Sequence, residues 1–278
     1  MRHPRFSIVI PTRNRASLLP CAIRSALAQT FDDFEIVVVD NASSDGTAAA
    51  LQQFRGHRLR IVRSDTARLM HDNWAFALGH ARGQFVLYLC DDDAWHPRLL
   101  ECADRAITRT SAEVVCWRSI THFSNDWFEP TRRGLVNFGP PFADAAFDID
   151  NAALLDAAFD LRITITDIVP RMLNSAVSAD LIHRLAAQRI RLFRPCNPDY
   201  SCFMAKATAA RRMIYLDVPL LLSGATPASV GASASQRGDT ARRFLDQLLA
   251  HEPELILPQP PRTPAVWIGQ TYMQCASE

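Results

Sequence analysis

Short apolar runs alternate with helix-like segments through the first 118 residues, and this alternation constrains the fold more than any other feature. The runs are rich in β-branched and aromatic residues and cover residues 6–10, 34–39, 59–62, 85–89 and 113–117. Such runs are typical of strands that are buried on both faces. Apolar residues repeat at helical spacing within residues 18–27, 70–81 and 99–107, and turn and cap residues precede a further helical segment at 48–54. The pattern predicts an α/β fold with a Rossmann-like, mostly parallel sheet flanked by helices.

Polar residues follow three of the predicted strands. Asp40 and Asn41 follow the second strand, and three aspartates follow the fourth. The first strand is followed by Pro11, Thr12, Arg13 and Asn14. Sheets of this kind bind ligands beyond the carboxyl ends of their strands. We therefore expect these polar groups to converge on one crevice.

The three aspartates, Asp91, Asp92 and Asp93, stand at the mouth of a buried strand. Adjacent carboxylates repel one another by about 1 kcal/mol per pair even at water-like dielectric, and by more where solvent is excluded. A divalent cation with oxygen ligands turns this repulsion into attraction, and it can also neutralise a diphosphate. The trio therefore points toward nucleotide-sugar chemistry.

Residues 119–148 differ in texture from the preceding part, because they are rich in aromatic residues, prolines and glycines. They indicate a long irregular segment, and long loops in compact domains are usually functional or disordered. Helical patterns follow around residues 177–186 and from about 199 to 213. An apolar strand is predicted at 215–222, a loop of small residues at 223–235 and a terminal helix at 240–250.

Composition narrows the classes of partner and compartment. The 278 residues carry a net charge of +1, which gives no electrostatic argument for a nucleic-acid partner. No apolar stretch reaches the roughly 18 residues of a membrane span, and the run at 6–10 is too short for a signal peptide. Seven cysteines without a C-x-x-C pair indicate a reduced, cytoplasmic chain. The basic residues are almost all arginines, because Lys206 is the only lysine. Peripheral membrane association through an arginine patch stays open.

Three motifs appear in order at residues 7–15 (SIVIPTRNR), 35–47 (EIVVVDNASSDGT) and 83–93 (GQFVLYLCDDD). Together they resemble the nucleotide-binding half of a family 2 glycosyltransferase with the GT-A fold. Residues 174–178 and 197–200 resemble acceptor-side elements of some members. The resemblance implies a nucleotide-sugar-binding half at 1–118, an acceptor-side half at 119–222, and a loop with a C-terminal helical tail at 223–278.

The same resemblance implies roles on the nucleotide side. In such enzymes the end of the first strand, here Pro11 and Thr12, lies against the nucleotide. Asp40 corresponds to the aspartate that accepts the base N–H of uracil or thymine, although a carboxylate also suits a guanine edge. Asn73 resembles an asparagine near the nucleotide, and Arg68 is a candidate for a phosphate contact. The implied nucleotide-binding set is Pro11, Thr12, Arg13, Asn14, Asp40, Asn73 and Asp91.

The metal motif departs from the common D-x-D form. If Asp92 is the second aspartate, Cys90 occupies the first position. We assign Mn²⁺ or Mg²⁺ to Asp92. Asp91 and Asp93 are left as helpers to ribose, sugar hydroxyls or metal-bound water, with Asp93 on the donor-sugar side.

Members of this family are expected to invert the anomeric centre in one displacement, with a carboxylate of the second half as general base. Asp199 is the candidate, since it lies in a Pro-bounded turn ahead of a helix. Asp167 and Asp180 are alternatives, and Asp199 could instead be the N-cap of that helix. The aromatic segment at 122–142 would help to form an acceptor platform.

These features predict an enzyme that moves a sugar from a nucleoside diphosphate donor, with UDP or dTDP favoured, to a hydroxyl of a carbohydrate or glycoconjugate. Surface polysaccharide or glycoconjugate synthesis is the expected setting. A sugar-nucleotide nucleotidyltransferase is an alternative, but residues 11–14 contain no phosphate-binding glycine. A non-catalytic nucleotide-binding relative also stays open. A dinucleotide-dependent oxidoreductase is disfavoured because no G-x-G-x-x-G follows a strand.

Overall fold

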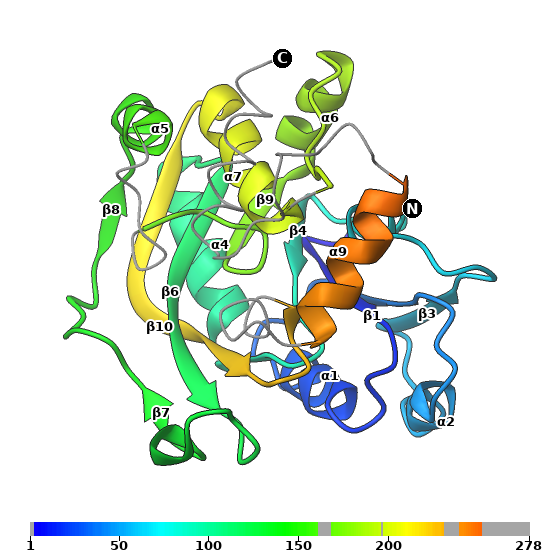
Figure 1. Ribbon diagram of the computed structural model, residues 1–278. Helices are drawn as coiled ribbons and strands as arrows, with labels where there is room; N and C mark the ends of the chain where they lie inside the picture. Colours follow the sequence, from blue (N-terminus) through cyan, green and yellow to red (C-terminus); the bar gives the residue numbers. More distant parts are fainter. Residues whose placement is uncertain (1–2, 161–167, 196, 231–238, 252–278) are drawn as a thin grey trace.

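The computed structural model describes residues 3–160, 168–195, 197–230 and 239–251, which form one ten-stranded sheet covered by helices (Figure 1). The strands are β1 (Phe6–Thr12), β2 (Phe34–Asp40), β3 (Leu59–Arg63), β4 (Phe85–Tyr88), β5 (Ala94–Trp95), β6 (Val114–Phe123), β7 (Val136–Asn137), β8 (Ala146–Asp148), β9 (Ser175–Ser178) and β10 (Met213–Ala225). The helices are α1 (Leu19–Leu27), α2 (Thr47–Leu51), α3 (Met70–Leu78), α4 (Leu99–Thr110), α5 (Asn151–Phe159), α6 (Ala179–Ala187), α7 (Pro198–Ala209) and α9 (Asp239–His251), with a 3-10 turn, η1 (Pro130–Arg132).

The sheet joins both halves of the chain. Its strand order is β3-β2-β1-β4-β9-β6-β10-β5, with β7 beside β6 and β8 beside β10. Strands β1 to β4 run in parallel, as predicted, and β10 runs parallel to β6. Strand β9 is antiparallel to both of its neighbours, β4 and β6. The carboxyl ends of β1, β2 and β4 therefore meet at one edge of the sheet.

Two hydrophobic cores cover the two faces of the sheet. Ile8 and Ile10 of β1 pack in the core that contains α1 and α4. Val9, which lies between them, packs in the core that contains α3, α6 and α7. Successive side chains of a strand point to opposite faces, so a strand buried on both sides must be apolar throughout. This requirement explains why the central strands read as unbroken apolar runs.

The structure shifts several predicted boundaries. The division at residue 118 falls inside β6, which continues to Phe123, and the division at 222 falls inside β10, which continues to Ala225. Val177, expected in a helix, belongs to β9, and α6 begins at Ala179. In each case pairing with a neighbouring strand decides the boundary: β10 pairs with β6 as far as Phe123, and β9 is held between β4 and β6. Local sequence pattern does not reveal such pairing.

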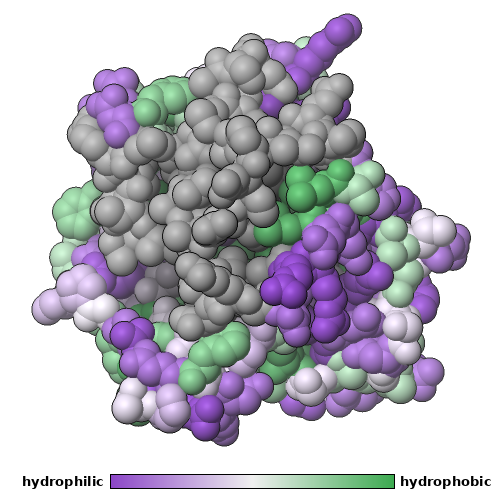
Figure 2. All heavy atoms as spheres, viewed as in Figure 1, coloured by the Kyte–Doolittle hydropathy of each residue, from purple (hydrophilic) through white to green (hydrophobic). Residues whose placement is uncertain are grey.

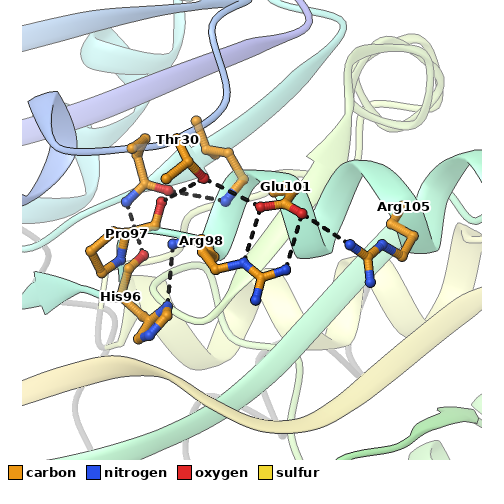
Figure 3. Close-up of polar contacts among 8 residues, drawn as sticks. Thr30, His96, Pro97, Arg98, Glu101 and Arg105 are labelled. Atoms are coloured by element: carbon orange, nitrogen blue, oxygen red, sulfur yellow. Dashed lines mark hydrogen bonds and ion pairs between the residues drawn. The ribbon is translucent and has the colours of Figure 1, made fainter.

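Polar contacts fix the turn that leads into α4 (Figure 3). The backbone N–H of Thr30, just after α1, donates to the carbonyl oxygen of Pro97 over 2.9 Å. Arg98 and Arg105 both donate to the carboxylate of Glu101, at 3.1 and 2.9 Å. Because α4 closely follows residues 91–93 in the chain, these contacts anchor the C-terminal side of the acidic turn.

Two expectations from composition can be compared with the structure. Within the described ranges, no helix combines the length and the apolar character that a membrane crossing requires. The described cysteines, at positions 21, 90, 102, 116 and 202, are all free thiols. Cys196 and Cys275 lie outside the described residues.

Candidate active site

A cavity of about 530 Å³ opens at the carboxyl ends of β1 and β4. Its walls come from the loop after β1, from α3, from the acidic turn after β4, from the first turn of α7 and from the end of β10. Helix α9 also borders the cavity, through Phe244 and Gln247, while Leu248 of the same helix is buried. The surface along α9 carries both hydrophilic and hydrophobic side chains (Figure 2). The predicted convergence of polar groups on one crevice therefore holds for most of the predicted residues.

Asp91 ties the acidic turn to the loop after β1. The Thr12 hydroxyl donates to Asp91 Oδ2 over 2.7 Å, and Arg15 Nε lies 3.4 Å from Asp91 Oδ1. Arg15 also donates to the carbonyl oxygen of Ala228. Burial, followed by the charge of Asp92, raises the pKa of Asp91 to about 7, although Arg15 and Thr12 oppose this shift. Asp91 therefore has protein partners on β1 before any ligand binds.

Asp93 ties the other side of the same turn to β10. The backbone N–H of Gly224 donates to Asp93 Oδ1 over 2.8 Å. A Cβ at Gly224 would lie 2.0 Å from the carbonyl oxygen of Asp92, so this close approach of two backbones requires glycine. Burial, followed by the charge of Asp92, raises the pKa of Asp93 well above its usual range. The end of β10 thus holds the acidic turn in place.

The residues around Asp92 fit a divalent cation. Cys90, Asp92 and Asp93 each offer one ligand atom, and these atoms lie within 4.8 Å of one another. Burial raises the pKa of Asp92, and burial followed by the charge of Asp92 raises that of the Cys90 thiol. Positive charge at this point would relieve the accumulated negative charge. The two carboxylates supply the oxygen ligands that Mn²⁺ and Mg²⁺ prefer, whereas the Cys90 sulfur is a softer donor.

Asp199 borders the cavity from the first turn of α7. Its Oδ1 accepts the N–H of Leu173 over 3.2 Å, and its Oδ2 lies 3.4 Å from Arg171 Nη1. The N-cap of α7 is Asn197, whose side chain accepts the N–H of Tyr200. The alternative reading of Asp199 as the N-cap is therefore wrong. Asp199 is only 9% exposed, yet it lies at the wall of the cavity.

Most of the predicted nucleotide-side residues line the cavity, namely Pro11, Thr12, Arg13, Asn73 and Asp91. The Asn73 side chain is 5% exposed, and its Oδ1 has no hydrogen-bond partner among the described residues. A buried acceptor without a partner is costly, so a ligand N–H or O–H would satisfy it. Arg68 lines the cavity as well, and its backbone is held at both polar groups by the Asn41 side chain.

Asn14 and Asp40 do not line the cavity, which corrects their predicted placement. Asp40 is 1% exposed; its Oδ1 accepts the N–H of Ser43 over 3.0 Å, and its Oδ2 pairs with Arg63. Asn14 Oδ1 accepts the N–H of Ser44 over 2.8 Å. Both side chains close the turn that follows β2, because short polar side chains readily bond to nearby backbone N–H groups. Asn41, the next residue after Asp40, does line the cavity.

The other candidate bases and the aromatic segment do not line the cavity where the structure describes them. Asp180 is exposed in the first turn of α6 and does not line the cavity, and Asp167 lies outside the described residues. No residue of the aromatic segment 122–142 borders the cavity. Phe123 and Trp127 pack against each other and are buried, whereas Phe138 is 60% exposed. As the structure stands, this segment does not provide an acceptor platform at the cavity.

The contributors to the cavity that the sequence analysis does not assign to the site include Arg15, Arg171, Gly224 and helix α9. Arg15 stands at the end of the first motif, so its position next to Asn14 was a usable signal. Arg171 and Gly224 have no such signal, because they reach the cavity only through tertiary structure. Helix α9 was predicted as a helix, but nothing in its sequence indicates what it covers.

Comparison with known proteins gives a family. The model of the family described as Glycosyl transferase family 2 matches residues 7–164. A PGL/p-HBAD biosynthesis glycosyltransferase of Mycobacterium bovis is 39% identical over 97 residues, which cover 34% of this chain and 38% of that protein. A UDP-Glc:alpha-D-GlcNAc-diphosphoundecaprenol beta-1,3-glucosyltransferase of Escherichia coli is 32% identical over 95 residues, with the same two shares. The match thus spans well under half the length of these curated relatives.

A solved structure extends the likeness in fold to nearly the whole chain. Residues 1–349 of S. aureus TarS in complex with UDP-GlcNAc match with a TM-score of 0.61 and 19% identity. The match covers 98% of this chain and 81% of that one. At this identity the likeness concerns the fold alone, and the family model supplies the rest. The chain belongs to glycosyltransferase family 2 and has the GT-A fold.

Proposed function

We propose that this chain is a metal-assisted glycosyltransferase that moves a sugar from a nucleoside diphosphate donor to an acceptor hydroxyl. One observation carries the proposal: Asp92 and Asp199, which lie 107 positions apart in the sequence, border the same cavity of about 530 Å³. A cation-binding carboxylate and a candidate base in one cavity are what this displacement needs. Family membership supports the class of reaction, and it disfavours a nucleotidyltransferase.

On the donor side, Asp92 would hold the cation and Asp93 lies close enough to share it. A divalent ion bound there would neutralise the diphosphate as it leaves. Arg13 and Arg68 line the same cavity and bring positive charge toward phosphate oxygens. UDP or dTDP is favoured over GDP, and two similar proteins, a UDP-Glc-dependent glucosyltransferase of Escherichia coli and S. aureus TarS in complex with UDP-GlcNAc, support UDP.

On the acceptor side, Asp199 would remove the proton of the attacking hydroxyl. Leu173 and Arg171 hold its two oxygens, which fixes the direction of the carboxylate. A base within hydrogen-bond reach of the nucleophile is required for a single displacement, and such a displacement inverts the anomeric centre. The acceptor would be a carbohydrate or glycoconjugate, and the product a surface polysaccharide or glycoconjugate made in the cytoplasm, with peripheral membrane association left open.

A thermal-shift panel tests the proposal. UDP, dTDP, GDP and ADP are each added with Mn²⁺, with Mg²⁺ and without metal. Ligand binding raises the melting temperature by mass action. We expect UDP or dTDP to stabilise the chain only when a divalent ion is present. If GDP is the one nucleotide that stabilises the chain, the donor carries guanine and not uracil or thymine. No response to any nucleotide would contradict a nucleotide-sugar transferase.

The second candidate is a non-catalytic relative that binds a nucleotide and transfers nothing. The exposed apolar residues outside the cavity, such as Phe138 and Phe142, are compatible with a binding role. Slow release of UDP from UDP-glucose or UDP-N-acetylglucosamine with Mn²⁺, with water as the acceptor, distinguishes the two. Release that depends on Asp199 supports catalysis. Nucleotide binding without release from any donor supports the non-catalytic role.

A further inference from the structure

Lys206 is an ammonium group inside the protein core. It lies on α7 and is 0% exposed, and it is the only lysine of a chain whose other cationic side chains are arginines and histidines. Burying an ammonium costs several kcal/mol unless hydrogen bonds and opposite charge compensate. A methionine or leucine would fill the same helix position without that cost. The contacts of Lys206 therefore need an explanation.

The first contact leads to Arg171. Lys206 Nζ donates to Ser175 Oγ over 2.8 Å, and the Ser175 hydroxyl donates to the carbonyl oxygen of Arg171. Ser175 is the first residue of β9 and is 0% exposed. The guanidinium of Arg171 in turn lies 3.4 Å from Asp199 Oδ2. One chain of polar contacts thus runs from the buried amine to the carboxylate at the cavity wall.

The second contact leads to the backbone of Asp199. Lys206 hydrogen-bonds with Cys202, one turn earlier on the same helix. The Cys202 thiol donates to the carbonyl oxygen of Asp199 over 2.9 Å. Residues 199, 202 and 206 share one face of α7, because they are three and four positions apart. The amine therefore braces the first turn of α7 as well as the Arg171 segment.

We propose that Lys206 is a positioning residue that holds Asp199 in its working orientation through Ser175, Arg171 and Cys202. The proposal rests on the proposed function, in which Asp199 is the general base. A base that is misplaced by 1 Å can lose a hundredfold in rate, so a dedicated brace has a clear use.

The surrounding groups agree with this role. Burial lowers the pKa of Lys206, while Cys202, Asp199 and Cys116 of β6 act in the opposite direction. Burial acts likewise on Arg171, yet Asp199, Tyr200 and Asp93 raise its pKa. The titratable groups that interact with this arrangement are thus Tyr88 on β4, Cys90 and Asp93 after it, Cys116 on β6, Arg171, and Asp199, Tyr200, Cys202 and Lys206 on α7.

Three variants test the proposal. Lys206→Met removes the amine and keeps the length of the side chain, and Ser175→Ala breaks the link to Arg171 while it leaves the amine in place. Ser201→Ala is the matched control, because Ser201 is also buried on α7 but bonds to Leu192, Arg194 and Pro198 instead. Folding is checked by circular dichroism and melting temperature. Rates are measured as UDP release from UDP-glucose or UDP-N-acetylglucosamine with Mn²⁺ across pH.

In Lys206→Met we expect kcat to fall roughly 10- to 100-fold with the donor KM within about twofold, because the loss concerns the base rather than donor binding. Ser175→Ala should lower kcat in the same way but by less. Ser201→Ala should lower the melting temperature without lowering kcat. A folded Lys206→Met protein with wild-type kcat, or with a donor KM that rises in proportion to the loss of kcat, overturns the proposal.

A crystal structure of Lys206→Met gives a readout that needs no substrate. The Arg171 guanidinium should separate from Asp199 Oδ2, which it approaches to 3.4 Å in the native chain. An unchanged pair overturns the proposal, and so does wild-type kcat in Ser175→Ala if Lys206→Met does not fold. Asp199→Asn distinguishes a failure of the proposed function from a failure of the positioning role. If it transfers normally, the assigned base is wrong; if it is inactive while Lys206→Met is normal, only the positioning role is wrong.

Discussion

The carboxylates of the cavity lie in two opposite electrostatic surroundings. Asp91, Asp92 and Asp93 crowd one turn, where burial raises the pKa of each and the charge of Asp92 raises those of its two neighbours further. Asp199 is the single carboxylate of its helix turn and has the guanidinium of Arg171 at 3.4 Å. Because the three aspartates repel one another, they are suited to binding a divalent metal ion that arrives with the ligand. Asp199 is a single carboxylate with Arg171 beside it, so its orientation is held without a metal ion.

The difference shows how one cavity can serve two tasks, the binding of a metal ion and the orientation of a catalytic carboxylate. The acidic turn is held by hydroxyl and backbone donors from β1 and β10 and by one cation, Arg15, which fix its position but leave excess negative charge on three carboxylates. Asp199 is held by a cation and an N–H, which compensate its charge. Removing a negative charge should therefore raise the stability of the chain in the acidic turn and lower it at Asp199. At both places it should have a large effect on the transfer reaction.

The largest effect should come from Asp199→Asn. An amide cannot take the acceptor proton, so transfer should fall roughly 10²- to 10⁴-fold. Nucleotide affinity, measured by isothermal titration calorimetry with UDP and Mn²⁺, should stay unchanged, because Asp199 stands on the acceptor side. Asp180→Asn is the control, since Asp180 is exposed and remote from the cavity lining. Transfer at the wild-type rate in Asp199→Asn would show that another group is the base.

Asp92→Asn should act on the metal instead. Loss of a direct ligand should weaken Mn²⁺ binding at least as much as loss of an outer partner, which costs roughly 10- to 100-fold. The stabilisation by UDP that depends on Mn²⁺ should disappear, while the melting temperature without metal should not fall. Calorimetric titration of Mn²⁺ in the presence of UDP checks this. Undiminished affinity in the variant would mean that Asp92 is not the metal ligand.

Gly224→Ala tests how the acidic turn is held. The added Cβ would meet the Asp92 carbonyl at 2.0 Å, so the end of β10 or the turn must move. We expect a loss of about 1–3 kcal/mol in the free energy of unfolding, as for other overpacked sites, together with weaker Mn²⁺ binding. Gly46→Ala is the matched control, because its Cβ would meet only Ala16, at 3.5 Å. Equal losses in both variants, measured by urea unfolding, would speak against the tight contact.

Asp91→Asn tests the repulsion itself. The pKa of Asp91 is raised to about 7 in the folded chain, so its ionisation opposes folding. Stability from the protonated form is fully present below the usual pKa of about 4 and is lost as pH rises through about 7. Relative to the native chain, the variant should gain stability as the pH rises from about 4 to about 7 without divalent ions, with an upper limit of about 4 kcal/mol for a shift of about three pKa units. Melting temperatures across pH check this, and a difference independent of pH would contradict it.

Phe138→Ser should have the smallest effect on the reaction. Phe138 is 60% exposed and does not border the cavity, although the sequence placed it in an aromatic acceptor platform. We expect kcat to change by less than about twofold, within the range of an ordinary surface substitution. Phe244→Ser is the informative partner, because Phe244 does line the cavity. A tenfold loss in Phe138→Ser would restore the platform that the structure argues against.

The nucleotide side was the more predictable half. Strands β1, β2 and β4 are buried on both faces, so their sequences are mostly apolar, and Asp91 to Asp93 follow shortly after β4 in sequence. Parallel pairing then carries Thr12 to within 2.7 Å of Asp91 without further information. Asp40 shows the limit of such reasoning. Its place after β2 was correct, but its two oxygens turn to Ser43 and Arg63, and no sequence pattern specifies that choice.

The acceptor side depended on contacts between distant segments. Asp199 could be proposed from its turn, but whether it capped α7 depended on the exact start of that helix. The partners Arg171, Leu173 and Lys206 carry no motif of their own. The misplaced aromatic segment has the same cause: its composition suits sugar contacts equally well wherever the segment lies, and β7 within it pairs along the edge of β6 instead.

The sequence by itself determined the layered α/β architecture, the parallel order of the first strands and the presence of an acidic turn at their carboxyl ends, because these follow from local burial periodicity and chain order. Only the tertiary structure decided which charges face one another. Arg15 meets Asp91, Gly224 meets the backbone of Asp92, and Lys206 reaches Arg171 through Ser175. Those pairings depend on how the last strands and helices close over the first ones, and electrostatic energies change steeply over such short distances.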